Sequence, residues 1–213
     1  RDMGGFGIYL RKAINEGEIR GPRVVAAGKI INQTGGHGDF HFLPPEWADR
    51  SFFSIQCDGA DSFRRGARLQ IREGADFLKI CTTGGVMSEK DGPADPQMTP
   101  DEIAPVVEEA RRVGTFVASH AQYPEGINNA LRAGVKTIEH GFVMDNESFS
   151  LFKEKQAIYV PTLIILKRLA EGESMGVPPN SVRKAKINRA YHVDTVKRAM
   201  SEGVRIACGS DFL

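Results

Sequence analysis

Four side chains that could carry out chemistry lie at the ends of apolar segments: Lys79, His120, His140 and Asp211. The lysine is the most unusual, because an ammonium group without a partner is unfavourable in a buried strand and tends to lose its charge. Two imidazoles and a carboxylate are suitable ligands for a divalent metal such as zinc. The set therefore predicts metal chemistry, provided that the fold brings its members to one place.

A repeating pattern of helix, glycine-containing turn and apolar strand would bring them together. It occurs six times, at residues 5–31, 62–80, 99–120, 124–140, 146–166 and 181–211. Strands that alternate with helices predict a parallel sheet, and this many units in succession favour an α/β fold of the (β/α)8 TIM-barrel type over an open sheet. The long loops, including 32–60, all follow strands, so we expect them at the carboxyl-terminal face, where barrels build active sites.

The two-residue period of a strand predicts which side chains point into the barrel. The pairs expected to share the inward face are Phe77 with Lys79, Ala118 with His120, and Ile138 with His140. By the same rule Glu139 points outward to the helices and is structural. A further strand is placed at 159–166, and His192, in a helix far from any strand end, is interpreted as a surface residue.

Composition excludes several classes of function. The chain has 28 basic and 27 acidic residues, which gives no sign of a nucleic-acid or membrane surface partner. No apolar run approaches the roughly 20 residues that span a bilayer. Three widely spaced cysteines are typical of a reduced, cytoplasmic protein. We expect a small-molecule substrate, and a homo-oligomer.

Several motifs together resemble a known family. "FLKICTTGG", "VASHAQ", "TIEHG" and "GSD" follow one another in the order of the amidohydrolase superfamily, in its branch of imidazolonepropionase-like enzymes and Xaa-Pro dipeptidases (prolidases), and "TGGHGD" and "QMTPDEI" match as well. The resemblance implies that carbon dioxide carboxylates Lys79 and that the carbamate bridges two divalent metal ions, expected to be zinc. It further implies that His120 and His140 bind the second metal, and that Asp211 binds the first and shuttles a proton.

The implied reaction is hydrolysis of the amide bond of a dipeptide or N-acyl amino acid by a metal-activated hydroxide, with Xaa-Pro dipeptides as the first substrate to test. His37 and Tyr123, on loops beside the metals, are the candidates for substrate binding. The branch also contains enzymes that prefer basic carboxyl-terminal residues, and the choice between proline and a basic residue stays open.

One feature of the family is missing. Its first strand carries a His-x-His pair for the first metal, whereas His37 and His41 here are spaced as H-x-x-x-H in a glycine-rich loop. The resemblance therefore implies that residues 1–213 are one metal-dependent barrel domain, running from about strand two to strand eight. The first strand, the last helix and a small β-domain would lie outside the chain.

Two other interpretations remain. A lysine at the end of a barrel strand also forms Schiff bases in aldolases, where desolvation lowers its pKa. That chemistry needs neither the two histidines nor Asp211. The chain could also be a catalytically inactive barrel fragment that only binds small molecules or partners.

Overall fold

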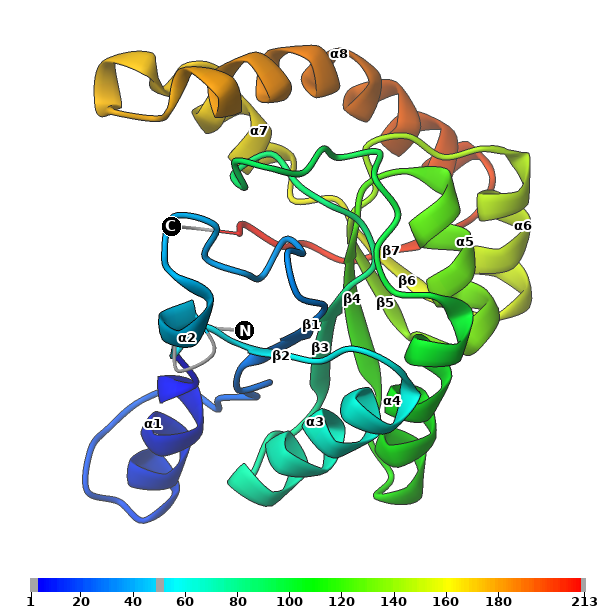
Figure 1. Cartoon of the computed structure of the whole chain (residues 1–213). Coiled ribbons are helices and arrows are strands. Elements are labelled where there is room, and N and C mark those ends of the chain that lie inside the picture. The colour runs from blue at the N-terminus through cyan, green and yellow to red at the C-terminus, as the bar shows by residue number, and fades with distance from the viewer. Residues whose placement is uncertain (1–3, 49–51, 212–213) are drawn as a thin grey trace.

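The computed structural model describes residues 4–48 and 52–211. Its centre is a sheet of seven parallel strands in the order β2-β1-β3-β4-β5-β6-β7 (Figure 1). The strands are β1 (Ile30–Asn32), β2 (Ser54–Gln56), β3 (Leu78–Cys81), β4 (Val117–Ala121), β5 (Thr137–His140), β6 (Ile158–Val160) and β7 (Arg205–Ile206). The predicted α/β class is confirmed. Within the described part of the chain the sheet is open, with β2 and β7 at its edges, so the architecture is that of a partial barrel.

Helices connect the strands, and several of them pack against one face of the sheet. They are α1 (Phe6–Asn15), α2 (Pro45–Ala48), α3 (Ala60–Glu73), α4 (Pro100–Arg112), α5 (Pro124–Ala133), α6 (Asn146–Glu154), α7 (Leu163–Ala170) and α8 (Pro179–Ser201), with a 3-10 turn, η1, at Gly172–Met175. Local sequence sets their ends: Thr99 and Glu102 form a capping box at the start of α4. Gly74 and Gly134 end α3 and α5 with φ of 95° and 96°, values that favour glycine.

The main core lies between the sheet and helices α3 to α6. Strand residues Leu78, Ile80, Val117, Ile138 and Tyr159 pack there with helix residues such as Phe63, Ile103, Ile127 and Phe149. A smaller apolar cluster joins α7 and α8 to the loops that follow β3 and β5; it consists of Val86, Phe142, Ile165, Leu166, Leu169, Ala170 and Ala185. The second cluster holds two helices over the carboxyl-terminal ends of the strands.

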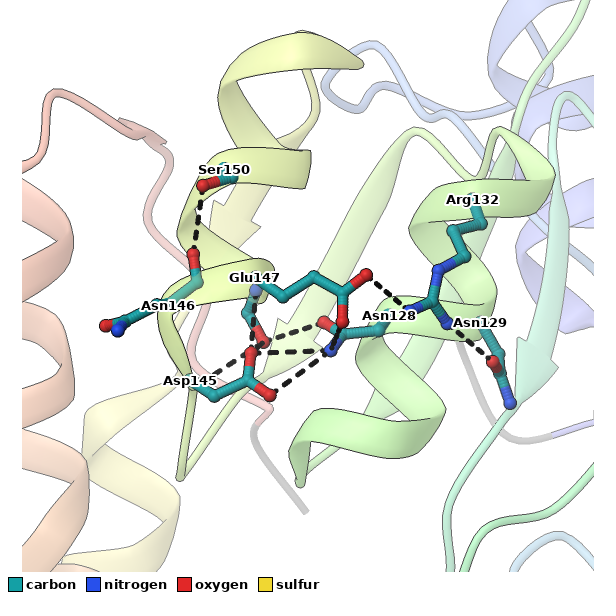
Figure 2. A network of polar contacts seen from close by, with 8 residues as sticks. Asn128, Asn129, Arg132, Asp145, Asn146, Glu147 and Ser150 are labelled. Atoms are coloured by element: carbon teal, nitrogen blue, oxygen red, sulfur yellow. Dashed lines mark hydrogen bonds and ion pairs between the residues drawn. The ribbon is translucent and has the colours of Figure 1, made fainter.

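A polar network fixes the start of α6, directly after the loop that follows β5 (Figure 2). Asp145 caps α6 by accepting a hydrogen bond from Ser148 N at 2.8 Å. Asn128 of α5 donates to both carboxylate oxygens of Asp145 at 3.4 Å. Arg132 of α5 forms an ion pair with Glu147 of α6. The network ties α5 to α6 and so anchors the far end of the segment that begins at His140.

Two predictions of secondary structure are wrong. The strand expected at 159–166 ends at Val160, and Leu163–Ala170 is a helix. Pro161 follows the strand and Thr162 has a left-handed φ of 50°, so the chain turns there. The buried residues of the new segment, Ile165, Leu166, Leu169 and Ala170, follow a helical rather than a strand period. The region 32–60, expected to be one loop, contains α2 and the edge strand β2.

None of the helices in the described ranges is long and apolar enough to cross a membrane.

Candidate active site

A cavity of about 810 Å³ lies at the carboxyl-terminal ends of the strands. Five of the six residues predicted for the site line it: Lys79 from β3, His120 from β4, His140 from β5, Asp211 after β7, and His37 from the loop after β1. The sixth, Tyr123, is not among the lining residues. The parallel strands therefore bring the chemically capable side chains together as the repeating pattern predicts.

Lys79 is paired with a carboxylate. Its side chain is 11% exposed and forms an ion pair with Glu139 Oε2, while Glu139 Oε1 accepts a hydrogen bond from Thr137 Oγ1 at 2.6 Å. Glu139 was predicted to point outward, and this prediction is wrong, because Glu139 lines the cavity. The buried ammonium thus has an acidic partner on β5, across β4 on the cavity face of the sheet, as a buried charge requires.

The reason lies in the backbone of β5. Thr137 and Glu139 share the cavity face, whereas Ile138 is fully buried in the core between sheet and helices, so the prediction that Ile138 and His140 share a face is wrong. His140 has a φ of 78°, in the left-handed region that non-glycine residues rarely adopt. This turn breaks the two-residue period, and consecutive side chains at 139 and 140 both reach the cavity.

His120 and His140 are neutral imidazoles in contact. Their ring centroids are 4.6 Å apart in an edge-on arrangement. Burial is the main cause that lowers the pKa of His120 far below its usual value, followed by His37, His140 and Lys79. Burial also lowers the pKa of His140, followed by Lys79. The neutral ring is the form that binds a metal.

One nitrogen of each ring is held by the protein. His120 Nε2 lies 3.0 Å from the Gly84 carbonyl, which can only accept, so Nε2 carries the hydrogen and Nδ1 is left with its lone pair. His140 Nδ1 lies 2.8 Å from Thr162 Oγ1. Hydrogen bonds of this kind orient the histidine ligands of metal sites.

His37 and Tyr123, the two predicted substrate contacts, lie in different surroundings. The His37 ring stacks on His120 with centroids 4.1 Å apart and an interplanar angle of 22°. The Tyr123 hydroxyl donates to Asn188 Oδ1 of α8 at 2.9 Å, away from the cavity. Partial burial, and then Tyr191, raises the pKa of Tyr123, which keeps the hydroxyl protonated as the donor of this bond.

His192 was predicted to be a surface residue, and this is wrong. Its side chain is 1% exposed and packs against Phe142 with ring centroids 4.9 Å apart. Burial lowers the pKa of His192 to about 4, although the nearby backbone of His140 acts in the opposite direction; neither ring nitrogen reaches hydrogen-bonding geometry. His192 is therefore a neutral ring that packs against Phe142, in the segment that follows His140.

The side chains of the cavity are chemically suited to a divalent metal only in part. Among residues 4–48 and 52–211, no three His, Cys, Asp or Glu side chains converge into a metal-binding group. The two neutral imidazoles, His120 and His140, share the cavity with Lys79 and Asp211. Two nitrogen donors and a carboxylate suit a divalent metal chemically.

Sequence reasoning missed Glu139, and also Ser88 and Asp91 in the loop between β3 and α4. This loop supplies Val86 and Met87 to the cavity wall, and Ser88 contacts His37. No spacing rule identifies such residues, because they lie in a long loop without regular period.

Known proteins share this fold. The model of the amidohydrolase family matches residues 1–212. Ochratoxinase from Aspergillus niger is 36% identical over 224 residues, which cover 99% of this chain and 47% of that protein. The crystal structure of that ochratoxinase matches with a TM-score of 0.90 at 35% identity, over 99% of this chain and 51% of that one.

Two further crystal structures are similar. A Xaa-Pro dipeptidase with bound methionine has a TM-score of 0.87 and 37% identity, over 99% of this chain and 53% of that chain. A prolidase complexed with N-methylphosphonate-L-proline has a TM-score of 0.90 and 36% identity, over 96% and 52%. The chain spans about half the length of the curated ochratoxinase it matches. It belongs to the amidohydrolase family.

Proposed function

We propose that residues 1–213 are the barrel domain of a metal-dependent hydrolase that cleaves the amide bond of a dipeptide or N-acyl amino acid. The observation that supports this most is the pair of neutral histidines, His120 and His140, beside the buried Lys79 in one cavity. The names of the similar proteins, an ochratoxinase, a Xaa-Pro dipeptidase and a prolidase, agree with a hydrolase.

In this proposal four residues hold the metal ions: Lys79 as its carbamate, His120, His140 and Asp211. Bound divalent metal, with zinc the first candidate, supplies a Lewis acid and lowers the pKa of water. Asp211 accepts the proton of the attacking water and delivers it to the amine nitrogen as the carbon–nitrogen bond breaks, so that the products are an acid and an amine. His37, whose ring stacks on that of His120, would contact the substrate. Tyr123 is not assigned a role, since its hydroxyl faces Asn188.

The lining of the cavity favours an apolar substrate group over a basic one. Its wall contains Phe40, Phe53, Val86, Phe142, Ile165, Leu166 and Leu169. The carboxylates among the described lining residues are Glu139, which is paired with Lys79, and Asp211, which the mechanism uses. A substrate cation would therefore be desolvated here without a carboxylate partner, which is costly. We propose that proline and bulky apolar or aromatic residues are accepted better than arginine or lysine.

A substrate panel tests the proposal. The full-length protein, supplied with zinc and bicarbonate, is assayed against L-Xaa-L-Pro, L-Xaa-L-Arg and N-acyl-L-phenylalanine substrates. We expect metal-dependent hydrolysis with the apolar substrates preferred. Lys79→Ala should abolish it, and Lys79→Arg should fail as well, because a guanidinium stays cationic. Hydrolysis that survives complete metal removal would contradict the proposal.

The aldolase interpretation gives a different result in a second assay. Borohydride reduction in the presence of a carbonyl substrate should leave Lys79 unmodified if Lys79 serves a metal site. A covalent adduct on Lys79 would support Schiff-base chemistry. The 213-residue chain assayed alone against a dipeptide panel, with added metal and bicarbonate, tests the interpretation as an inactive fragment, and hydrolysis by this chain would exclude that interpretation.

A further inference from the structure

The loop between β3 and α4 contains a buried carboxylate with an unusual set of partners. Asp91 is 9% exposed. Its Oδ1 accepts hydrogen bonds from Gly85 N at 2.9 Å and from the Ser88 hydroxyl, and its Oδ2 accepts from Gln97 Nε2 at 2.9 Å. Three donors around one buried carboxylate hold it in a single orientation.

Two of these partners continue to His37. Ser88 Oγ lies 2.8 Å from His37 Nδ1, and Gln97 Oε1 accepts a hydrogen bond from His37 N at 2.9 Å. Asp91 is thus connected to both the ring and the backbone of His37, by way of one residue in each case. The two contacts come from opposite ends of the same loop.

The hydrogen bonds determine which nitrogen of His37 carries a hydrogen. A carboxylate can only accept, so the single hydroxyl hydrogen of Ser88 is directed to Asp91. The other acceptor near the hydroxyl, the Gly85 carbonyl, is farther away at 3.5 Å. Ser88 Oγ must then accept from His37, and Nδ1 is the donor. The direction of the chain is His37 Nδ1–H to Ser88 Oγ–H to Asp91.

Packing leaves the His37 ring little freedom. One face stacks on His120. Gly85 lies so close that a Cβ there would be 2.0 Å from His37 Cε1. The loop itself is fastened to α8, because Lys184 Nζ donates to the carbonyls of Ser88 at 2.8 Å, Gly85 at 3.2 Å and Asp91. In Figure 1, α8 runs above this loop.

We propose that Asp91 and Ser88 are positioning residues for His37, which fix its Nδ1–H tautomer and hold its ring toward the substrate, and that Lys184 secures them to α8. The kinetic part of this inference rests on the proposed amide hydrolysis, whereas the tautomer does not. Ser88 and Asp91 act through His37 and touch no reacting atom.

The kinetic test is a double-mutant cycle in the full-length protein. Ser88→Ala should lower kcat/KM by about two- to tenfold, the value of one neutral hydrogen bond, mainly through KM. In a His37→Ala background the same change should have no further effect, because the residue through which it acts is gone. Ser88→Thr, which keeps the hydroxyl, should restore most of the loss. Independent, multiplying losses from the two alanine changes would overturn the inference.

The second measurement reports the tautomer of His37 directly and does not require catalytic activity. Side-chain nitrogen NMR of His37 should show a protonated, pyrrole-type Nδ1 in the wild type, and this signal should change in Ser88→Ala and Asp91→Asn. Asp95→Asn is the matched control, since its carboxylate accepts from the backbone of Gly92 in the same loop, and it should leave the signal unchanged. An unprotonated Nδ1 in the wild type would refute the assignment. A protein with the expected signal but no hydrolysis would refute the proposed function alone.

Discussion

At the scale of residues, the unusual feature is the buried Lys79 of β3, whose acidic partner Glu139 lies on β5, two strands away in the sheet. Lys79 and Glu139 form a pair that is 11% and 18% exposed at the cavity. Removal of one member of such a pair leaves a poorly solvated charge, whereas removal of both leaves none. We can therefore predict how this pair affects the free energy of unfolding, and this prediction does not depend on any catalysed reaction.

In metal-free protein without bicarbonate, Glu139→Gln and Lys79→Met should each lower the free energy of unfolding by about 1 to 3 kcal/mol. This loss is smaller than the one expected for a fully buried ion pair, because both side chains are partly exposed at the cavity. The double variant should recover most of the loss. Urea unfolding of the four proteins measures the coupling. Losses that simply add would show that the pair does not form in solution.

The close packing of Gly85 against His37 predicts the effect of a substitution at Gly85. A Cβ at Gly85 would be 2.0 Å from Cε1 of His37, and the stacked ring cannot move away without losing its contact with His120. Gly85→Ala should therefore lower kcat/KM as much as His37→Ala does. Gly92→Ala is the control, because a Cβ there is 3.2 Å from Asp95 Oδ2 and far less crowded. Wild-type kinetics in Gly85→Ala would contradict the packing.

At the scale of elements, strand period predicted Lys79 and His120 correctly, since both lie in regular strands. It could not predict Glu139 and His140, because the left-handed φ of His140 breaks the period and no sequence rule requires that conformation of a histidine. His192 was missed for another reason: the buried face of α8 includes polar residues, among them Asn188 and His192, so its hydrophobic pattern is weak. The orientations of Glu139 and His140 and the burial of His192 depend on packing between residues far apart in the sequence.

Helices α3 and α4 are joined by an acidic side chain beneath three arginines. Glu109 is 7% exposed and forms ion pairs with Arg64, Arg68 and Arg112. The hydrogen bond from Arg68 is the largest cause that lowers the pKa of Glu109 to about 2, partly opposed by burial. This folded value lies below the ordinary value, so the stabilisation is present above about pH 4.5 and is lost as the pH falls toward 2.

Glu109→Gln should accordingly lower the free energy of unfolding at pH 7 by on the order of 2 kcal/mol, after allowance for solvent screening around the more exposed arginines. The difference from wild type should narrow between pH 5 and pH 3. Glu108→Gln is the matched control: its side chain is 45% exposed and pairs with Arg64, so we expect a loss of less than about 0.5 kcal/mol. Urea unfolding at several pH values measures both, and a pH-independent difference would exclude the electrostatic origin.

At the scale of the whole molecule, the open sheet gathers the metal-binding candidates unevenly. Lys79, His120 and His140 come from the adjacent strands β3, β4 and β5, whereas Asp211 follows the edge strand β7. The ring of His41, the other histidine of the glycine-rich loop, is hydrogen-bonded to loop residues: Nε2 lies 3.1 Å from the carbonyls of Gly35 and Gly36, and Nδ1 accepts from Lys90 N at 3.2 Å.

That the protein forms a homo-oligomer stays a prediction.

We therefore predict that the 213-residue chain alone binds at most one divalent metal tightly. Lys79, once carboxylated, and the two neutral imidazoles provide three ligands for one ion, while a second ion would have only Asp211 and the shared carbamate, fewer than the usual four-coordinate zinc geometry needs. Metal analysis after dialysis measures the stoichiometry, and His140→Ala should reduce it to none. Two tightly bound ions per chain would contradict the prediction, and would require His37 or His41 to leave its loop contacts and become a ligand.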